Sequence, residues 1–170
     1  MNSFETLIFY RGVSSENPID KPYLKTPRKD RRPKNSPNNF HLFADKWFKE
    51  KFGIAYRSQG LFVTSKILTA SSYAESKDHI VRVIPTSPYS YCWSPKLSDL
   101  LFLAKDMANS SEVEIHACLE KMQYCEEGLD LAHQSGHEVM IFCNEYISIP
   151  AGLSESSKIK IPKIILPTFF

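Results

Sequence analysis

One stretch in the first third of the chain carries the apolar spacing of a helix. Its large apolar side chains stand three or four positions apart, at Phe40, Phe43, Trp47 and Phe48, so they share one helical face. Asn39 stands before these residues as a candidate N-cap, and Gly53 follows where a helix commonly ends. Residues 39–53 are therefore predicted to form an amphipathic helix.

The other regular segments divide between short apolar runs, which predict strands, and longer helical patterns. Strands are expected within residues 4–12, 60–65, 79–85, 138–150 and 158–170. Helices are expected within residues 68–76, 94–107, 110–122 and 128–136. Ser111 and Glu114 have capping-box spacing, Pro95 stands near a helix start, and Gly136 ends the last helix.

The order of these segments bears on the fold class. Strands surround helical insertions without a regular strand–helix–strand alternation, and no glycine-rich turn leads from a strand into a helix. This pattern favours an α+β domain over a Rossmann-type sheet. A dinucleotide that binds here would do so by a route other than G-x-G-x-x-G.

Length and composition narrow the class of protein. The 170 residues, 42% of them hydrophobic, suit a single domain over residues 1–170, and the net charge of +2 excludes a histone-like polycation. No apolar run approaches the ~20 residues of a membrane span. The N-terminus lacks the pattern of a secretory signal, so we expect a cytoplasmic protein that binds no membrane. The four cysteines are expected to be buried free thiols, and no Cys or His spacing predicts a metal site.

Residues 14–38 differ from the rest of the chain. They hold five prolines and few large apolar side chains, which predicts a surface loop without regular structure. Within it, residues 25–34 carry six basic side chains against one acidic residue, Asp30. This stretch is either a solvated loop or a grip for a phosphate backbone, with Tyr23 nearby to stack on a base.

Three short segments together suggest a chemistry. Tyr10-Arg11-Gly12 ends the first predicted strand, Thr64-Ser65 ends a later one, and Glu138 opens the apolar run of residues 138–143. In this order they resemble the Arg, Ser-Thr-Ser and Glu motifs of the mono-ADP-ribosyltransferases, a superfamily of bacterial toxins and phage modifying enzymes. The resemblance spans residues 10–150 and implies a split β-sheet core with helical insertions.

The resemblance implies NAD as co-substrate and a role for each matched residue. Glu138 would stabilise the charge that develops on the ribose as the nicotinamide bond breaks. Arg11, beside Gly12, would hold the diphosphate, Thr64 and Ser65 would brace the site, and Tyr73 would stack on nicotinamide. Arg57 is a second candidate for the phosphates, or else pairs with a carboxylate at the edge of the core.

The acceptor is less defined than the donor. Arginine-modifying members carry Glu or Gln two residues before the catalytic Glu, where this chain has Gly136. His137 is either an acceptor contact or an exposed turn residue without a role. Glu145 is a rival catalytic carboxylate, although its segment, NEYISIP, is typical of a turn between strands.

These observations lead to one principal function and two alternatives. The principal function is transfer of ADP-ribose to nucleic acid or protein by a toxin-like or phage-conflict enzyme, with an inhibitory antitoxin as a further partner. The alternatives are an NAD glycohydrolase and a non-catalytic nucleic-acid-binding module. Acceptor contacts are expected from the basic stretch and from the turn before Glu138, at Arg28, Lys29, Arg31, Arg32 and His137.

Overall fold

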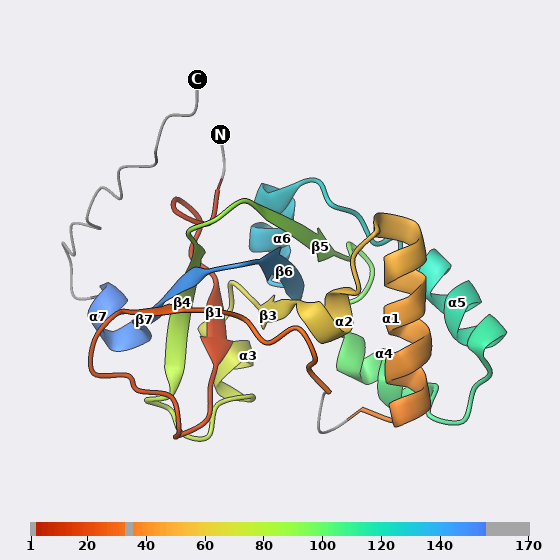
Figure 1. Ribbon diagram of the computed structural model, residues 1–170, viewed down its shortest axis with the longest axis horizontal. Helices are drawn as coiled ribbons and strands as arrows, with labels where there is room; N and C mark the ends of the chain where they lie inside the picture. Colours follow the sequence, from red (N-terminus) through yellow and green to blue (C-terminus); the bar gives the residue numbers. More distant parts are fainter. Residues whose placement is uncertain (1–2, 33–35, 156–170) are drawn as a thin grey trace.

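Two antiparallel sheets form the centre of the structure, a computed structural model that describes residues 3–32 and 36–155 (Figure 1). The first sheet has the order β1-β4-β7-β2 and the second β3-β6-β5. The strands of the first sheet are β1 (Tyr10–Gly12), β4 (Ile80–Pro85), β7 (Tyr146–Pro150) and β2 (Tyr23–Lys25). Those of the second are β3 (Leu61–Val63), β6 (Val139–Cys143) and β5 (Tyr89–Trp93). The described chain is therefore of the α+β class, as predicted.

A backbone bridge joins the two sheets. The Tyr10 N–H donates to the Thr64 carbonyl at 2.7 Å, and the Thr64 N–H donates to the Tyr10 carbonyl at 2.9 Å. The strands thus follow one another as β5-β6-β3-β1-β4-β7-β2, with the division between β3 and β1. A division at this point brings the ends of β1 and β3 together at the edge of both sheets.

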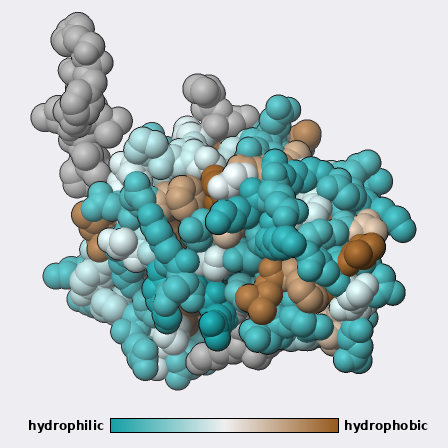
Figure 2. Space-filling view, turned by 45° about the vertical axis from the view of Figure 1, so that its right-hand side comes forward, coloured by the Kyte–Doolittle hydropathy of each residue, from teal (hydrophilic) through white to brown (hydrophobic). Residues whose placement is uncertain are grey.

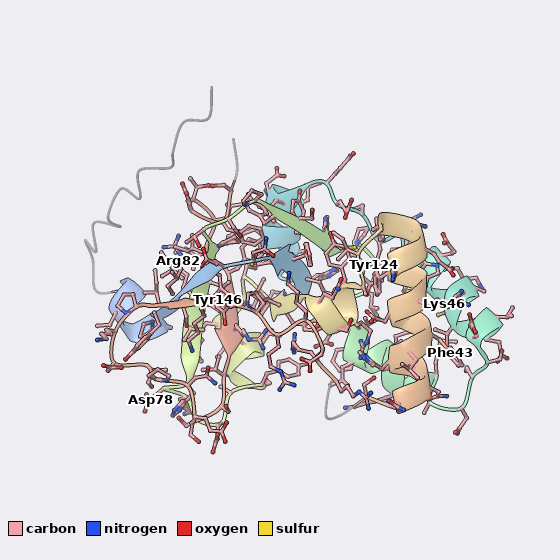
Figure 3. The ribbon with its side chains drawn as sticks, in the orientation of Figure 1. Phe43, Lys46, Asp78, Arg82, Tyr124 and Tyr146 are labelled. Atoms are coloured by element: carbon pink, nitrogen blue, oxygen red, sulfur yellow. The ribbon has the colours of Figure 1, made fainter. Side chains whose placement is uncertain are left out.

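Most of the helices lie at the edges and faces of the sheets. The helix α1 carries the predicted apolar face, with Phe40, Trp47 and Phe48 buried. It packs beside α5, where Lys46 pairs with Glu112 at 2.7 Å, and Phe43 and Lys46 mark this helical side of the molecule in Figure 3. The helices are α1 (Asn38–Phe52), α2 (Tyr56–Gln59), α3 (Ile67–Ser71), α4 (Leu100–Asp106), α5 (Glu112–Lys121), α6 (Leu129–Ser135) and α7 (Ala151–Glu155).

The buried apolar residues gather into two large clusters. One contains inward-facing residues of both sheets, such as Val83 of β4 and Ile141 of β6, together with Phe9. The other lies between β6 and the helices α1, α4 and α5, and includes Phe48 and Met140. Because β6 contributes side chains to both clusters, it holds the sheets and the helical side together.

Several predicted elements are confirmed. Helix 39–53 forms and ends at Gly53, whose φ of 77° is the left-handed conformation expected there. The capping box of Ser111 and Glu114 is present at the start of α5. The predicted strands at 60–65, 79–85 and 138–150 appear as β3, β4 and the pair β6 and β7, and the predicted helix at 128–136 as α6.

Other predictions need correction. Asn39 does not cap α1; its side chain donates to the Ala108 carbonyl at 2.9 Å. The loop at 14–38 contains the short strand β2, and β5, α2 and α7 were not expected. The helix predicted from residue 94 begins at Leu100, capped by Asp99 rather than placed by Pro95. The predicted strand at 158–170 lies outside the described residues.

The surface drawn in Figure 2 is mainly hydrophilic, with apolar side chains in small separate patches. Among residues 3–32 and 36–155, no helix combines the length and the apolar character needed to cross a bilayer. All four cysteines are unpaired; Cys92 and Cys143 are buried, whereas Cys118 and Cys125 are half-buried, less than was expected.

Candidate active site

A cavity of about 510 Å³ opens where the two sheets meet. Its walls come from β1, the end of β3, the residues around α3, the start of α4 and the residue before β6. Residues 26–32, which follow β2, close another side; in Figure 1 this red-to-orange stretch passes in front of the strands. We call residues 26–32 of this stretch the arginine strap.

Glu138 enters the cavity because of the strand register. Val63 pairs with Val139, so Thr64 and Glu138 are the next residues along their antiparallel strands. The Glu138 N–H donates to the Ser98 carbonyl at 2.8 Å, and its carboxylate accepts from the Leu100 N–H at 3.3 Å. Burial, with the nearby negative charge of Asp99, raises the pKa of Glu138 to about 8. These hydrogen bonds hold Glu138 in place, whereas its surroundings disfavour the charged form of the carboxyl group.

Arg11 lies on β1 across the division between the sheets. Its guanidinium is well suited to bind an anion, because Nη1 is buried and has no hydrogen-bond partner among the described residues. Burial lowers the pKa of Arg11. Gly12 follows at the cavity wall, where a Cβ would come within 2.4 Å of the Ala70 carbonyl, so a larger residue would push α3 away.

The Thr-Ser pair divides between two environments. Thr64 lines the cavity, and its hydroxyl donates to the Gly136 carbonyl at 2.8 Å, which fixes the turn before Glu138. Ser65 does not line the cavity; its hydroxyl donates to the His133 carbonyl at 2.6 Å, at the end of α6. Ser65 is thus a structural link between β3 and α6, and the expectation that it shares the cavity with Arg11 and Glu138 is corrected.

Tyr73 and Asp99 form the wall that faces α4. Tyr73 is 49% exposed, and its hydroxyl donates to the Asp99 carboxylate. Burial and this hydrogen bond raise the pKa of Tyr73, so its hydroxyl stays protonated. Asp99 also accepts from the Leu101 N–H at 2.7 Å as the N-cap of α4.

Arg57 is a buried residue of the cavity wall. It is only 2% exposed, lies over the Phe40 ring, and donates through Nη2 to Ser36 at 2.9 Å. Its Nε lies 3.4 Å from Nδ1 of His41, and burial together with this cation lowers the pKa of that histidine. The alternative role of Arg57 required its guanidinium to pair with a carboxylate at the edge of the core. Asp45 is the carboxylate beside it, but Asp45 accepts from the Arg57 backbone N–H and not from the guanidinium.

The arginine strap places three more cations at the cavity. Arg28 and Arg32 are exposed, whereas Arg31 donates to the Gly60 carbonyl at 2.6 Å and lies over the Phe62 ring. Burial, together with the positive charge of Arg11, lowers the pKa of Arg31 to about 9. Lys29 points elsewhere, to Asn144 at 2.9 Å, and does not line the cavity.

Two further candidates lie outside the cavity. Nδ1 of His137 is 2.8 Å from the Ser94 carbonyl, and its ring lies near that of Trp93. His137 is therefore a packing residue of the turn. Glu145 is exposed in the turn between β6 and β7, so Glu138, and not Glu145, is the candidate carboxylate that lines the cavity with Arg11.

Asp99 and Phe62 are the main cavity residues that the sequence analysis missed. Asp99 directly precedes the apolar run Leu-Leu-Phe-Leu-Ala, which is an N-cap signal, but Pro95 upstream offers a competing helix start. Phe62 carries no such signal, since only the structure shows Arg31 above its ring.

The charges of the cavity favour an anionic ligand. Five arginines face two carboxylates, Asp99 and Glu138. In residues 3–32 and 36–155, no group of three or more His, Cys, Asp or Glu is placed to hold a metal ion. The five arginines are Arg11, Arg28, Arg31, Arg32 and Arg57.

Comparison of the chain with protein-family models, curated proteins and solved structures finds no match.

Proposed function

We propose that this protein is an NAD-dependent mono-ADP-ribosyltransferase with a split-sheet core of that type. The observation that carries the proposal is that Arg11, on β1 of one sheet, and Glu138, directly before β6 of the other, line one cavity of about 510 Å³. This volume is within the roughly 300–1,000 Å³ of small-molecule sites. The buried, unpartnered Nη1 of Arg11 suits a phosphate oxygen of NAD.

Each wall of the cavity has a part in this chemistry. When bound, NAD supplies an ADP-ribosyl group whose ribose gains positive charge as the bond to nicotinamide breaks. Glu138, once ionised, would accept a hydrogen bond from the ribose 2′-OH and stabilise that charge. Arg11 and Arg57 would bind the diphosphate, and the half-exposed Tyr73 ring offers a face for nicotinamide.

The exposed arginines of the strap support a nucleic acid as the acceptor. Arg28 and Arg32 line the cavity while remaining exposed to solvent, so a phosphate backbone could reach both from outside. Because such contacts are electrostatic, transfer to RNA or DNA is expected to weaken steeply as salt concentration rises.

The test uses the purified 170-residue chain with NAD carrying a label on its adenosine. We expect release of nicotinamide and transfer of label to a lysate component that nuclease removes and protease does not. Glu138→Gln should abolish both while leaving NAD affinity within about threefold, because the lost contact is made mainly in the transition state. Glu145→Gln, the matched control, should retain activity.

The outcomes separate the alternatives. Label that protease removes identifies a protein acceptor, and free ADP-ribose as the sole product identifies an NAD glycohydrolase. Binding of nucleic acid that Glu138→Gln leaves unchanged, with no nicotinamide released by the wild type, identifies a non-catalytic module and overturns the proposal.

The acceptor assignment has its own variant. Arg28→Ala with Arg32→Ala should lose transfer to purified RNA and DNA but keep nicotinamide release to water, because Arg11 and Arg57 remain. Equal transfer by this variant and the wild type would contradict the strap's role. Lys29 and Arg31 are left intact, because their contacts with Asn144 and Gly60 belong to the fold.

A further inference from the structure

The cavity contains a second carboxylate with no part in the function described so far. Asp99 is 6% exposed and lines the cavity beside Glu138. One of its oxygens accepts from the Leu101 N–H at 2.7 Å, and the other accepts from the Tyr73 hydroxyl. Three features, the helix cap, the tyrosine and burial, therefore fix its orientation toward the cavity.

The start of α4 holds the two carboxylates side by side. Glu138 accepts from the Leu100 N–H and Asp99 from the Leu101 N–H, two consecutive amides. The Glu138 N–H also donates to the Ser98 carbonyl, so the strand and the helix start are tied on both sides of the carboxylates. Their proximity has an electrostatic effect, since the charge of Asp99 contributes to the raised pKa of Glu138.

Transfer of ADP-ribose requires a group that takes a proton from the acceptor. The bond between ribose C1′ and nicotinamide breaks, and nicotinamide leaves as a neutral molecule with the electron pair. A new bond forms between C1′ and the acceptor atom, which loses its proton. Glu138 is engaged with the ribose hydroxyl in the proposed function, so the proton needs another base.

We propose that Asp99 is this general base, accepting the proton of the acceptor nucleophile as it bonds to C1′. This inference rests on the proposed function of the cavity. Among the described residues of the cavity lining there is no histidine, lysine or cysteine to compete for the role. The Tyr73 hydroxyl donates a hydrogen bond to Asp99 and keeps its proton, so Tyr73 does not compete as a base.

The backbone explains why the second carboxylate comes from α4 and not from the segment before Glu138. Gly136, two residues earlier, has a φ of 71°, and a Cβ there would come within 2.2 Å of Cε of Lys66. A glutamate at that position would be strained and would displace Lys66. Asp99 supplies the carboxylate from a different element.

Asp99→Asn tests the role with water and with azide as acceptors of ADP-ribose from NAD. Asparagine keeps the capping function at this position, so the urea unfolding midpoint should not fall. Nicotinamide release to water should fall roughly 100-fold, while NAD affinity stays within about threefold. Azide is already an anion and bonds to C1′ without losing a proton, so adding it should restore nicotinamide release and yield ADP-ribosyl azide.

Asp106→Asn, at the exposed end of the same helix, is the control and should behave as the wild type. Asp99→Asn that releases nicotinamide to water as fast as the wild type would overturn the assignment and leave the proposed function standing. A loss that azide does not restore, in a variant whose unfolding midpoint has not fallen, would also overturn it. A wild type that releases no nicotinamide would refute the proposed function and Asp99's role together.

Discussion

Replacing Glu138 by glutamine should stabilise the folded protein, and by an amount that grows with pH. The carboxyl has a pKa of about 8 in the folded chain against 4.5 for an ordinary glutamate, because burial and Asp99 disfavour its charge. Between these values the folded chain keeps a proton that the unfolded chain has lost, so stability falls as pH rises from 4.5 to 8. Glutamine is neutral throughout and can still accept from the Leu100 N–H.

The magnitude follows from the same two values. Each pH unit between them corresponds to about 1.4 kcal/mol, which gives an upper bound of about 5 kcal/mol above pH 8. Glu138 is half-buried in a cavity that solvent enters, and screening reduces the expected difference to about 2–3 kcal/mol. Arg57 and Arg31 lie nearby and favour the charged form of Glu138. Their effect is already included in the pKa of about 8.

Urea unfolding of both proteins at pH 5, 7 and 9 measures the difference. The free energies of unfolding should nearly coincide at pH 5, and the variant should be the more stable at pH 9. The same titration predicts activity: nicotinamide release by the wild type should rise about tenfold from pH 6 to 7 and level off above pH 8. A difference that does not change with pH, or a less stable variant at pH 9, would refute the reasoning. Glu145→Gln, exposed in its turn, should leave stability unchanged.

Three further outcomes are expected. Arg11→Ala should raise the Kd for NAD at least roughly tenfold by calorimetry, without loss of stability, since no hydrogen bond to its Nη1 is removed. Gly136→Ala should lower the free energy of unfolding by about 1–3 kcal/mol through its φ of 71°; Lys66→Ala in the same chain should recover only the part due to the steric clash. Ser111→Ala should cost about 1 kcal/mol by removing the cap of α5, with nicotinamide release unchanged, and a loss of activity there would contradict the boundaries of the site.

The elements that the sequence predicted are those with a strong local signal. The helix α1 has a complete apolar face and a left-handed glycine at its end, and α5 has a capping box. The strand β2 lacks such a signal, because its three residues are extended by pairing with β7 inside a proline-rich segment. The strand β5 was missed for a similar reason, since its ladder to β6 stabilises a sequence that begins with an exposed tyrosine.

Strand geometry explains which site residues could be predicted. A sequence motif predicts that its residues lie at the end of a strand, and in the structure Arg11, Thr64 and Glu138 line one cavity. Successive side chains of an extended chain point to opposite sides, so Thr64 and Ser65 could not both face it. The motif alone does not specify which of the two does; the pairing of Tyr10 with Thr64 decides it.

The positive charge of the arginine strap predicts the environment of some of its residues but not of all. A cluster of basic residues in a proline-rich loop predicts an independent arm for a polyanion, and exposed Arg28 and Arg32 retain that character. Arg31 does not, because its bond to Gly60 and its place over Phe62 make it a wall of the cavity that also holds Arg11. In the proposed function, the inner side of the strap would therefore contact the donor and its outer side would face the acceptor. Since both sides share one short segment, an acceptor bound to Arg28 and Arg32 would lie next to the ribose that Glu138 contacts in the proposed function.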